Sequence, residues 1–170
     1  MDKELIAGGK FLSFVKKGRW EYVERPGIKG IVVILAITDE NEILLTEQYR
    51  IPVASNVIEL PAGLAGDIPG EEDEELSTAA KRELFEECGY EAGSMELLIE
   101  GPPSAGLTTE YISLFKAGQL KKTGDGGGDE SENIIVHKVP LTGLHDWLMQ
   151  KQEDGLMIDP KIFSGLYFLK

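Results

Sequence analysis

The sequence predicts an α+β fold in which helices cover a β-sheet. Short apolar or alternating segments, which are typical of strands, dominate the first third of the chain, and segments with helical periodicity punctuate the rest. The strands do not alternate regularly with helices, as they would in a βαβ protein. The length of 170 residues, with 42% hydrophobic and 28% charged residues, is typical of one globular domain. We therefore expect residues 1–170 to form a single domain.

Seven segments are predicted to be strands because they are apolar or alternate with period two. Turn signals such as Lys17-Gly18 and Pro26-Gly27 separate the early ones. The predicted strands cover residues 10–15, 20–25, 30–38, 42–49, 95–100, 111–117 and 133–139.

One strong helix is predicted over residues 74–88. Gly89 follows it as a plausible C-terminal stop. The apolar stripe of this helix has one residue at every fourth position: Leu76, Ala80, Leu84 and Cys88. The other predicted helices cover residues 141–152 and begin at Asp159-Pro160, an N-cap followed by a first-turn proline.

The charge balance excludes some classes of partner. The chain carries 30 acidic and 17 basic residues, a net charge of -13, which argues against binding of nucleic acid or of an anionic membrane. The longest apolar run, residues 31–37, is too short to span a bilayer, and the first ten residues lack the apolar stretch of a signal peptide. Cys88 is the single cysteine, so we expect a cytoplasmic protein in which this thiol is a small core residue.

The segment 82–90 predicts an acidic face on the main helix. Residues three and four apart share a helix face, so Glu83, Glu86 and Glu87 are expected to project to the same side, and Arg82 is able to pair with Glu86. At about 4 Å and an effective dielectric near 20, each carboxylate pair costs roughly 4 kcal/mol. Converging carboxylates therefore need a hard cation such as Mg²⁺, whereas splayed ones form an ordinary solvated helix face.

Two segments together resemble the signature of the Nudix hydrolases. The first is Glu-Leu-Pro-Ala-Gly at residues 59–63, and the second is Arg-Glu-Leu-Phe-Glu-Glu-Cys-Gly-Tyr at residues 82–90, which matches the family at every fixed position. The resemblance implies the Nudix fold, an αβα sandwich around a mixed β-sheet, with an N-terminal antiparallel strand extension.

The spacing inside this signature departs from the family. Residues 64–81 separate Gly63 from Arg82, five more than the family pattern has. Glu74 keeps the family's distance to Arg82, whereas Glu71 keeps its Pro-Gly-Glu context, so both are candidates for the first glutamate of the signature. We expect the insertion to bulge the loop before the helix and to leave the metal-binding face in place.

Three further sequence segments are similar to the ADP-ribose pyrophosphatase branch of the family: Glu-Gln-Tyr-Arg at 47–50, and residues 128–134 and 136–141. That branch splits the diphosphate of ADP-ribose, giving AMP and ribose 5-phosphate, or of related nucleoside diphosphate sugars. The resemblance implies Mg²⁺ as cofactor, with Mn²⁺ as a possible substitute. It also implies a homodimer in which residues 1–28 contribute to dimerisation and base binding. The turn at 104–106 lacks the branch's usual proline, so a nucleoside diphosphate hexose competes with ADP-ribose as the expected substrate.

The resemblance also assigns site residues. It makes the Ala62 carbonyl oxygen and three carboxylates metal ligands: Glu83, Glu86 and Glu87. It assigns the base that deprotonates or orients the attacking water to the glycine-rich segment 124–132, which composition alone would describe as a flexible surface loop. The catalytic candidates are Glu130, with Glu132 as the second choice, and Glu86.

Five residues are candidates for substrate binding. Arg50 has a planar fork that suits a phosphate, although a surface arginine at a strand end is the alternative. Trp20 stands where the family often has an aromatic that stacks on the base, and Phe11 is expected on the opposite face unless it packs in the core. Arg25 and Glu110 are expected to add polar contacts, although Glu110 is equally explained as a strand-edge carboxylate.

A catalytically silent Nudix-fold module that binds a nucleotide sugar is the alternative function. Relatives that lose activity usually lose carboxylates of the signature, and Glu83, Glu86 and Glu87 are all present. The sequence therefore favours an enzyme that acts on a small nucleoside diphosphate sugar.

Overall fold

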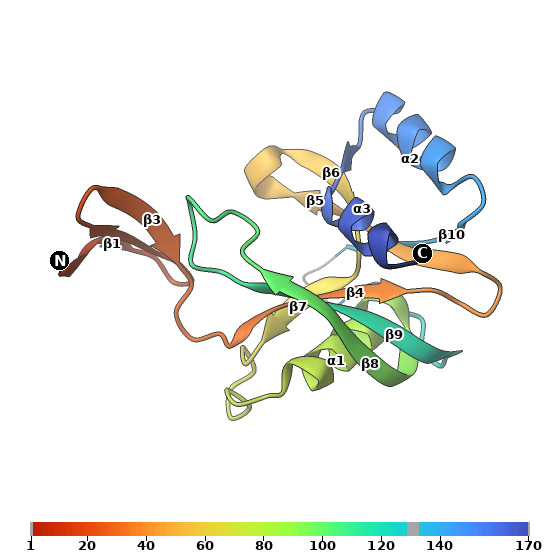
Figure 1. Ribbon diagram of the computed structural model, residues 1–170, viewed down its shortest axis with the longest axis horizontal. Coiled ribbons are helices and arrows are strands. Elements are labelled where there is room, and N and C mark those ends of the chain that lie inside the picture. The colour runs from red at the N-terminus through yellow and green to blue at the C-terminus, as the bar shows by residue number, and fades with distance from the viewer. Residues whose placement is uncertain (1, 129–132, 170) are drawn as a thin grey trace.

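The computed structural model describes residues 2–128 and 133–169 and has the predicted α+β class, with three α-helices and three β-sheets (Figure 1). The chain forms a body of two four-stranded sheets and an N-terminal three-stranded sheet that stands apart from it (Figure 1). The expected sandwich is thus built on two mixed sheets.

The central sheet has the strand order β7-β4-β9-β8. Only the pair β4 and β9 is parallel. Alternate residues of β4 face opposite sides: Val32 and Ile34 lie in one core cluster, and Val33 and Leu35 lie in the other. Both faces of this sheet are therefore covered. Its strands are β4 (Gly30–Ala36), β7 (Ala62–Ala65), β8 (Tyr90–Gly101) and β9 (Ile112–Lys122).

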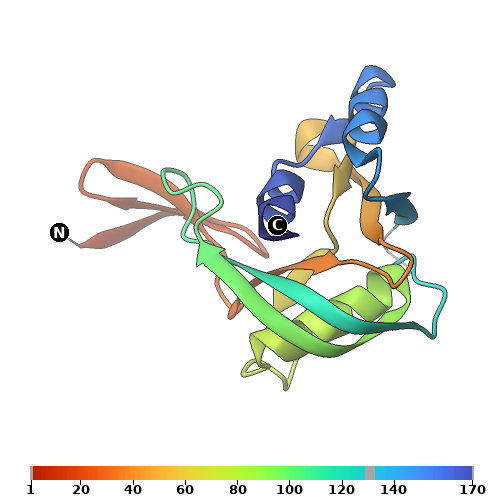
Figure 2. The ribbon, with the colours of Figure 1, turned by 45° about the vertical axis from the view of Figure 1, so that its right-hand side comes forward.

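Helix α1 (Leu76–Cys88) covers one face of the central sheet, and the second sheet with the remaining helices covers the other (Figure 2). The second sheet has the order β10-β5-β6-β11. Among the described residues, no helix combines the length and the apolar character needed to cross a bilayer. The elements of this layer are β5 (Glu42–Arg50), β6 (Ser55–Glu59), β10 (Ile135–Pro140), α2 (Leu144–Glu153), β11 (Met157–Ile158) and α3 (Lys161–Leu166), with short 3₁₀ turns at Ile51–Val53 and Tyr167–Leu169.

The N-terminal sheet is an antiparallel meander of β1 (Lys3–Gly8), β2 (Ser13–Lys17) and β3 (Trp20–Glu24). Backbone bonds tie it to the body: the Val23 N–H donates to the Leu107 carbonyl (2.8 Å), and the Thr109 N–H donates to the Val23 carbonyl (3.1 Å). This agrees with the expected strand extension. Its large apolar side chains are unusually exposed: Leu5, Ile6, Phe11, Leu12, Phe14 and Trp20.

Several boundaries differ from the sequence-based prediction. Strands β1, β6, β7 and β11 were not expected. Two of them give little signal in the sequence, since β11 has only two residues and β7 runs through the glycine of the signature. Strands β8 and β9 extend well beyond the predicted 95–100 and 111–117, since backbone pairing continues through Gly93 and Gly118, where the apolar alternation is interrupted.

The expected core position of Cys88 is confirmed, since its side chain is fully buried between α1 and the central sheet. Burial raises the pKa of the thiol far above its ordinary value, so almost no thiolate forms at neutral pH. We expect the native protein to be inert to Ellman's reagent over an hour and to react with one equivalent in 6 M guanidinium. Rapid modification of the native protein would contradict this assignment.

Candidate active site

The acidic face of α1 is divided between buried and exposed carboxylates. Glu83 and Glu87 are buried, with 9% and 5% of their surface exposed, whereas the side chain of Glu86 is 48% exposed. Of the two arrangements that the sequence left open, Glu83 and Glu87 are turned inward, whereas the Glu86 side chain is turned partly toward solvent. A step of four residues aligns Glu83 and Glu87 toward β7, and Glu86 lies further round the helix.

Both buried carboxylates meet the same dipeptide of β7. The Ala62 N–H donates to Glu87 Oε2 (3.0 Å). At Gly63 a Cβ atom would overlap the carboxyl group of Glu83, so only glycine leaves room for that side chain. The insertion in the signature lies before α1, as expected, and leaves this arrangement intact.

Arg82 holds the carboxylates around it in a fixed network. Its guanidinium donates to Glu83 (2.8 Å), to Glu86 (3.2 Å) and to the Leu64 carbonyl (2.9 Å). The predicted pairing of Arg82 with Glu86 is confirmed. Because Arg82 remains charged, it offsets the repulsion between Glu83 and Glu86.

The two candidates for the first glutamate of the signature are distinguished by contact with Arg82. Glu74 accepts two hydrogen bonds from the Arg82 guanidinium, at 3.2 and 3.0 Å, and its side chain is 5% exposed. Glu71 is exposed in the loop before α1. Glu74 therefore occupies the position that anchors Arg82, and its hydrogen bonds are the main cause that raises the pKa of the guanidinium.

Burial raises the pKa of Glu83 to about 7, and the adjacent Arg82 guanidinium opposes this rise. The charged form of this carboxylate is therefore poorly hydrated, and a nearby positive charge would stabilise it.

The donor set fits a hard divalent cation. The carboxylates of Glu83 and Glu87 lie against the adjacent residues Gly63 and Ala62, and carboxylate oxygens are ligands that Mg²⁺ and Mn²⁺ prefer. Over residues 2–128 and 133–169, no three acidic, histidine or cysteine side chains are gathered tightly enough to hold an ion as they stand. Arg82 now donates to Glu83 and Glu86, so an ion would compete with the guanidinium for both carboxylates.

A cavity of about 500 Å³ opens beside Glu83. It is lined by Ala62, Gly63 and Glu83 on the signature side. Three substrate candidates also line it, together with Glu59, as two ion pairs: Arg25 Nε with Glu110 Oε1 (2.8 Å), and Arg50 Nε with Glu59 Oε2 (2.6 Å). The structure therefore brings the predicted Arg25, Arg50 and Glu110 to one cavity.

Trp20 lies elsewhere, in a hollow of about 400 Å³ that it shares with Tyr22, Leu107 and Thr109. Its side chain is 54% exposed and presents a ring to that hollow. Phe11 lies in the turn between β1 and β2, with the Lys10 ammonium 4.7 Å from its ring centre, and does not line the hollow. The two aromatic candidates are not brought together within one chain.

The glycine-rich segment is docked on the end of α1. The Gly127 and Gly128 N–H groups donate to the carbonyls of Glu87 (2.7 Å) and Glu86 (3.1 Å). These bonds satisfy carbonyls that the end of a helix leaves open. The catalytic candidates Glu130 and Glu132 lie outside the described residues, but the chain that leads to them is attached directly to the carboxylate-bearing turn.

The sequence also matches a known protein family. The model of the NUDIX domain matches residues 28–155, which is most of the chain. The chain belongs to the Nudix family. The matched range includes the signature, the carboxylates of α1 and the glycine-rich segment, and it begins after the N-terminal sheet.

Relatives of this Nudix protein include pyrophosphatases. It is 38% identical to the methanol dehydrogenase activator of Bacillus methanolicus (88% of this chain, 75% of the relative) and 32% identical to the ADP-ribose pyrophosphatase of Bacillus subtilis (82% and 76%). A GDP-mannose pyrophosphatase of Pectobacterium atrosepticum is 31% identical (66% and 60%). A crystal structure of an ADP compounds hydrolase has the same fold, with a TM-score of 0.70 at 23% identity, covering 88% of this chain and 81% of that one.

Some residues of the Nudix site were not found from the sequence. Asp67, Glu59 and Lys161 line the cavity without having been predicted there. Glu59 lies within the signature, so its position was a signal that went unused. Lys161 follows a helix start near the C-terminus, and no local pattern connects it with a site formed by residues far away in the chain.

The docking of the glycine-rich segment predicts a substitution effect. Gly126 has a φ of +76°, and a Cβ there would lie 2.6 Å from the Glu87 carbonyl oxygen. We expect Gly126→Ala to displace the segment and to lower kcat about 10-fold with little change in KM, measured by steady-state kinetics. Gly101→Ala, where a Cβ meets nothing within 4 Å, is the matched control. Unchanged kcat in Gly126→Ala would contradict a catalytic role for this segment.

Proposed function

We propose that this Nudix protein hydrolyses the diphosphate bond of ADP-ribose or of a related nucleoside diphosphate sugar, with Mg²⁺ as cofactor. The observation that carries the proposal is the buried carboxylate of Glu83 in the wall of a cavity that Arg25 and Arg50 also line, with the buried Glu87 one helical turn away and bonded to Ala62 of the same wall. Buried carboxylates and a diphosphate are both anionic, and a bound divalent metal would stabilise both at once. The named ADP-ribose and GDP-mannose pyrophosphatases among its relatives support the same reaction class.

The metal would be held by the Ala62 carbonyl oxygen with Glu83, Glu86 and Glu87. When bound, Mg²⁺ supplies charge that stabilises the phosphoryl oxygens of the transition state. The protein's own part is to keep Glu83 and Glu87 against β7, where Gly63 gives them room, and to hold Glu86 at the exposed edge through Arg82. Mn²⁺ has the same preference for oxygen ligands and is the expected substitute.

Glu130 is the proposed base, and Glu132 is the second choice. The base accepts a proton from a water molecule whose oxygen attacks one phosphorus atom, and the bond from that phosphorus to the bridging oxygen breaks. With ADP-ribose the products are AMP and ribose 5-phosphate. The attachment of Gly127 and Gly128 to α1 supports this role, because it fixes the start of the segment beside the metal-binding turn.

The substrate is proposed to lie across the cavity with its diphosphate at Arg50, whose guanidinium is able to bond two phosphoryl oxygens. The Arg25–Glu110 pair adds polar contacts near the Trp20 hollow. Stacking on Trp20 is worth about 1–3 kcal/mol for a base. Phe11 supplies the opposite face of the base only if it comes from a second subunit.

A homodimer through the N-terminal sheet is therefore part of the proposal. Apolar side chains of β1 and of the turn between β1 and β2 are exposed in one chain, among them Leu5 (63%) and Phe11 (62%), and a partner would cover them. Analytical ultracentrifugation is expected to give a dimer that Leu5→Glu converts to a monomer. A monomeric wild-type protein would contradict this arrangement.

The buried Cys88 suits a reducing compartment, so we infer a cytoplasmic location.

A hydrolysis screen tests the proposed function. ADP-ribose, GDP-mannose, UDP-sugars and dinucleotides are incubated with the protein and Mg²⁺, and phosphomonoester products are measured with EDTA as control. We expect ADP-ribose or one nucleoside diphosphate sugar to give two phosphomonoesters only when the metal is present. No product from any member of the panel would contradict the proposal.

A regulatory role is the second candidate, because the relative at 38% identity is named a methanol dehydrogenase activator. The exposed apolar face of the N-terminal sheet would then serve a partner enzyme. An effect on a dehydrogenase that survives Glu87→Gln would favour a binding role, whereas loss of that effect would favour hydrolysis as its cause.

A further inference from the structure

We propose that Lys161 is a substrate-binding residue that binds the phosphoryl oxygens on the sugar side of the diphosphate, and that Asp159 positions it. This inference rests on the proposed function and adds a site element from the C-terminal helix, outside the Nudix signature. The sequence assigned no role to Lys161, and it assigned Asp159 only the role of a helix N-cap.

Asp159 fixes Lys161 at both ends of the side chain. One carboxylate oxygen of Asp159 accepts from the Lys161 N–H (2.7 Å), and the other forms an ion pair with the Lys161 ammonium. Asp159 is only 9% exposed, and its own N–H donates to the Ile58 carbonyl (2.9 Å), which attaches the start of α3 to β6. The ammonium is therefore held in one place before any ligand arrives.

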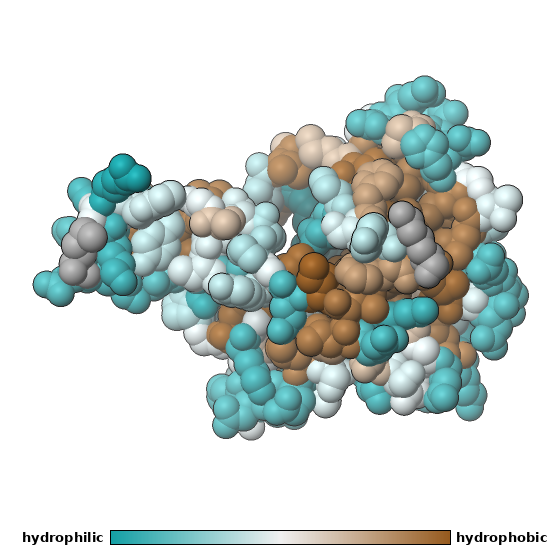
Figure 3. All heavy atoms as spheres, in the orientation of Figure 1, coloured by the Kyte–Doolittle hydropathy of each residue, from teal (hydrophilic) through white to brown (hydrophobic). Residues whose placement is uncertain are grey.

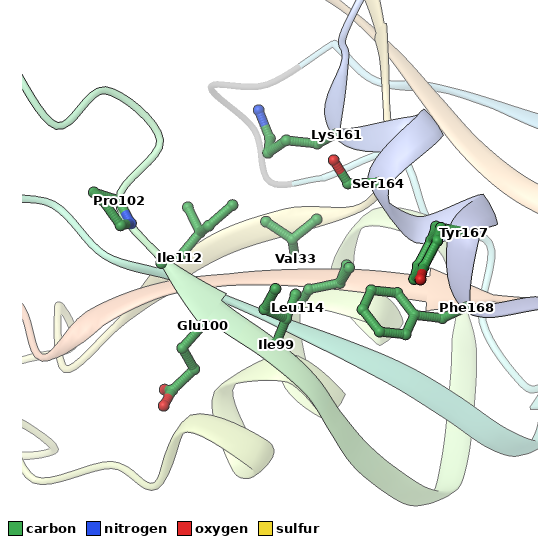
Figure 4. Close-up of a pocket in the computed structure, with 11 residues that line it drawn as sticks. Val33, Ile99, Glu100, Pro102, Ile112, Leu114, Lys161, Ser164, Tyr167 and Phe168 are labelled. Atoms are coloured by element: carbon green, nitrogen blue, oxygen red, sulfur yellow. The ribbon is translucent and has the colours of Figure 1, made fainter.

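That place is the wall of the catalytic cavity. Lys161 lines the cavity together with Arg50 and Glu83. It also borders an apolar hollow of about 360 Å³ on its other side, lined by Tyr167 and Phe168. In Figure 4 the ammonium points away from both rings and toward the side where Pro102 lies. The space-filling view shows hydrophobic residues gathered in this region of β8 and α3 (Figure 3).

The ammonium is able to take a phosphate as a further partner, because its ion pair with Asp159 leaves it on the cavity wall. Lys161 stands next to a second pair of the same kind, Arg50 with Glu59, so the four side chains are balanced in charge. An ammonium on a flexible stem has three donors, and within residues 2–128 and 133–169 its one hydrogen bond is to Asp159, so two donors are left there for phosphoryl oxygens. Arg50 and Lys161 together then contribute two cations to one diphosphate.

The position of the Trp20 hollow relative to the cavity places Lys161 on the sugar side. Thr109 lines the Trp20 hollow, and the next residue, Glu110, lines the cavity with Arg25, so the base hollow adjoins the Arg25 end. Lys161 lines the cavity but not the Trp20 hollow. A base at Trp20 therefore directs the sugar phosphate toward Lys161.

Equilibrium binding separates this role from a structural one. Calorimetry is performed on wild type, Lys161→Met and Lys161→Arg with Ca²⁺ in place of Mg²⁺, since its looser coordination disfavours turnover. We expect Lys161→Met to weaken ADP-ribose and ribose 5-phosphate about 10- to 100-fold, the range for a lost hydrogen bond to a charged group, and to leave AMP within about 2-fold. Lys161→Arg should restore most of the affinity. Lys138→Met, which breaks the exposed pair of Lys138 with Glu42, is the matched control.

The outcomes distinguish this inference from the proposed function. Equal affinities of wild type and Lys161→Met for ribose 5-phosphate would overturn the role of Lys161 while hydrolysis by the wild type stands. A selective loss of AMP binding would overturn the assignment to the sugar side. Wild-type protein that neither binds nor hydrolyses any nucleoside diphosphate sugar would instead overturn the proposed function itself.

Discussion

Glu87→Gln is expected to lower kcat about 10³-fold while the protein remains folded. Glu87 is buried against β7, and a glutamine oxygen is still able to accept the Ala62 N–H that Glu87 Oε2 accepts now (3.0 Å). The substitution removes the charge that a divalent cation needs, and a loss of about 4 kcal/mol of transition-state stabilisation corresponds to roughly that factor. Steady-state kinetics and thermal unfolding of the same preparation provide the measurement.

Two further glutamine variants serve as comparisons for Glu87→Gln. Glu86→Gln should cost less than Glu87→Gln, because the Glu86 side chain is 48% exposed and is held at the edge by Arg82. Glu96→Gln, on the exposed surface of β8, should leave kcat unchanged. Wild-type activity in Glu87→Gln would mean that the metal-binding assignment of this carboxylate is wrong.

Gly63→Ala is expected to lower kcat about 10²-fold by displacing Glu83. A Cβ at this position overlaps the carboxyl end of Glu83, which is the flexible end of a side chain, so the carboxylate moves and the backbone does not. The fold should therefore survive. Titration of the activity with Mg²⁺ is expected to show a higher half-saturating concentration than in the wild type.

Gly30→Ala on the neighbouring strand β4 controls for the loss of a glycine in the same sheet, because a Cβ there makes only ordinary contact at 3.4 Å with Leu76. We expect it to keep its Mg²⁺ requirement. If Gly63→Ala had the same activity and Mg²⁺ dependence as the wild type, the Glu83 carboxylate would not be part of the site.

The fold was predictable where local pattern and tertiary structure agree. The apolar stripe of α1 is one such case, since Ala80, Leu84 and Cys88 are all fully buried. The sheets were predictable only in part. Strand β6 pairs with β5, and β7 pairs with β4, through residues with no apolar alternation, and β11 depends on a parallel contact with β6. Such strands are defined by their partners and not by their own sequence.

Candidate site residues were predictable where they lie within a sequence motif. The signature led to Ala62, Glu83 and Glu87, and the branch resemblance led to Arg25, Arg50 and Glu110 in the cavity. The exposure of Glu86 and the choice of Glu74 as anchor depend on the Arg82 network, which spacing alone leaves open. Lys161 was missed because its contact with the cavity arises only when α3 packs on β6.

The most direct test of the account is anomalous scattering from crystals grown with Mn²⁺. We predict a Mn²⁺ peak bonded to carboxylate oxygens of Glu83 and Glu87, with Glu83 released from Arg82. A map without a peak at this place, in which Glu83 keeps its bond to Arg82, would contradict the metal-dependent reaction proposed for this site.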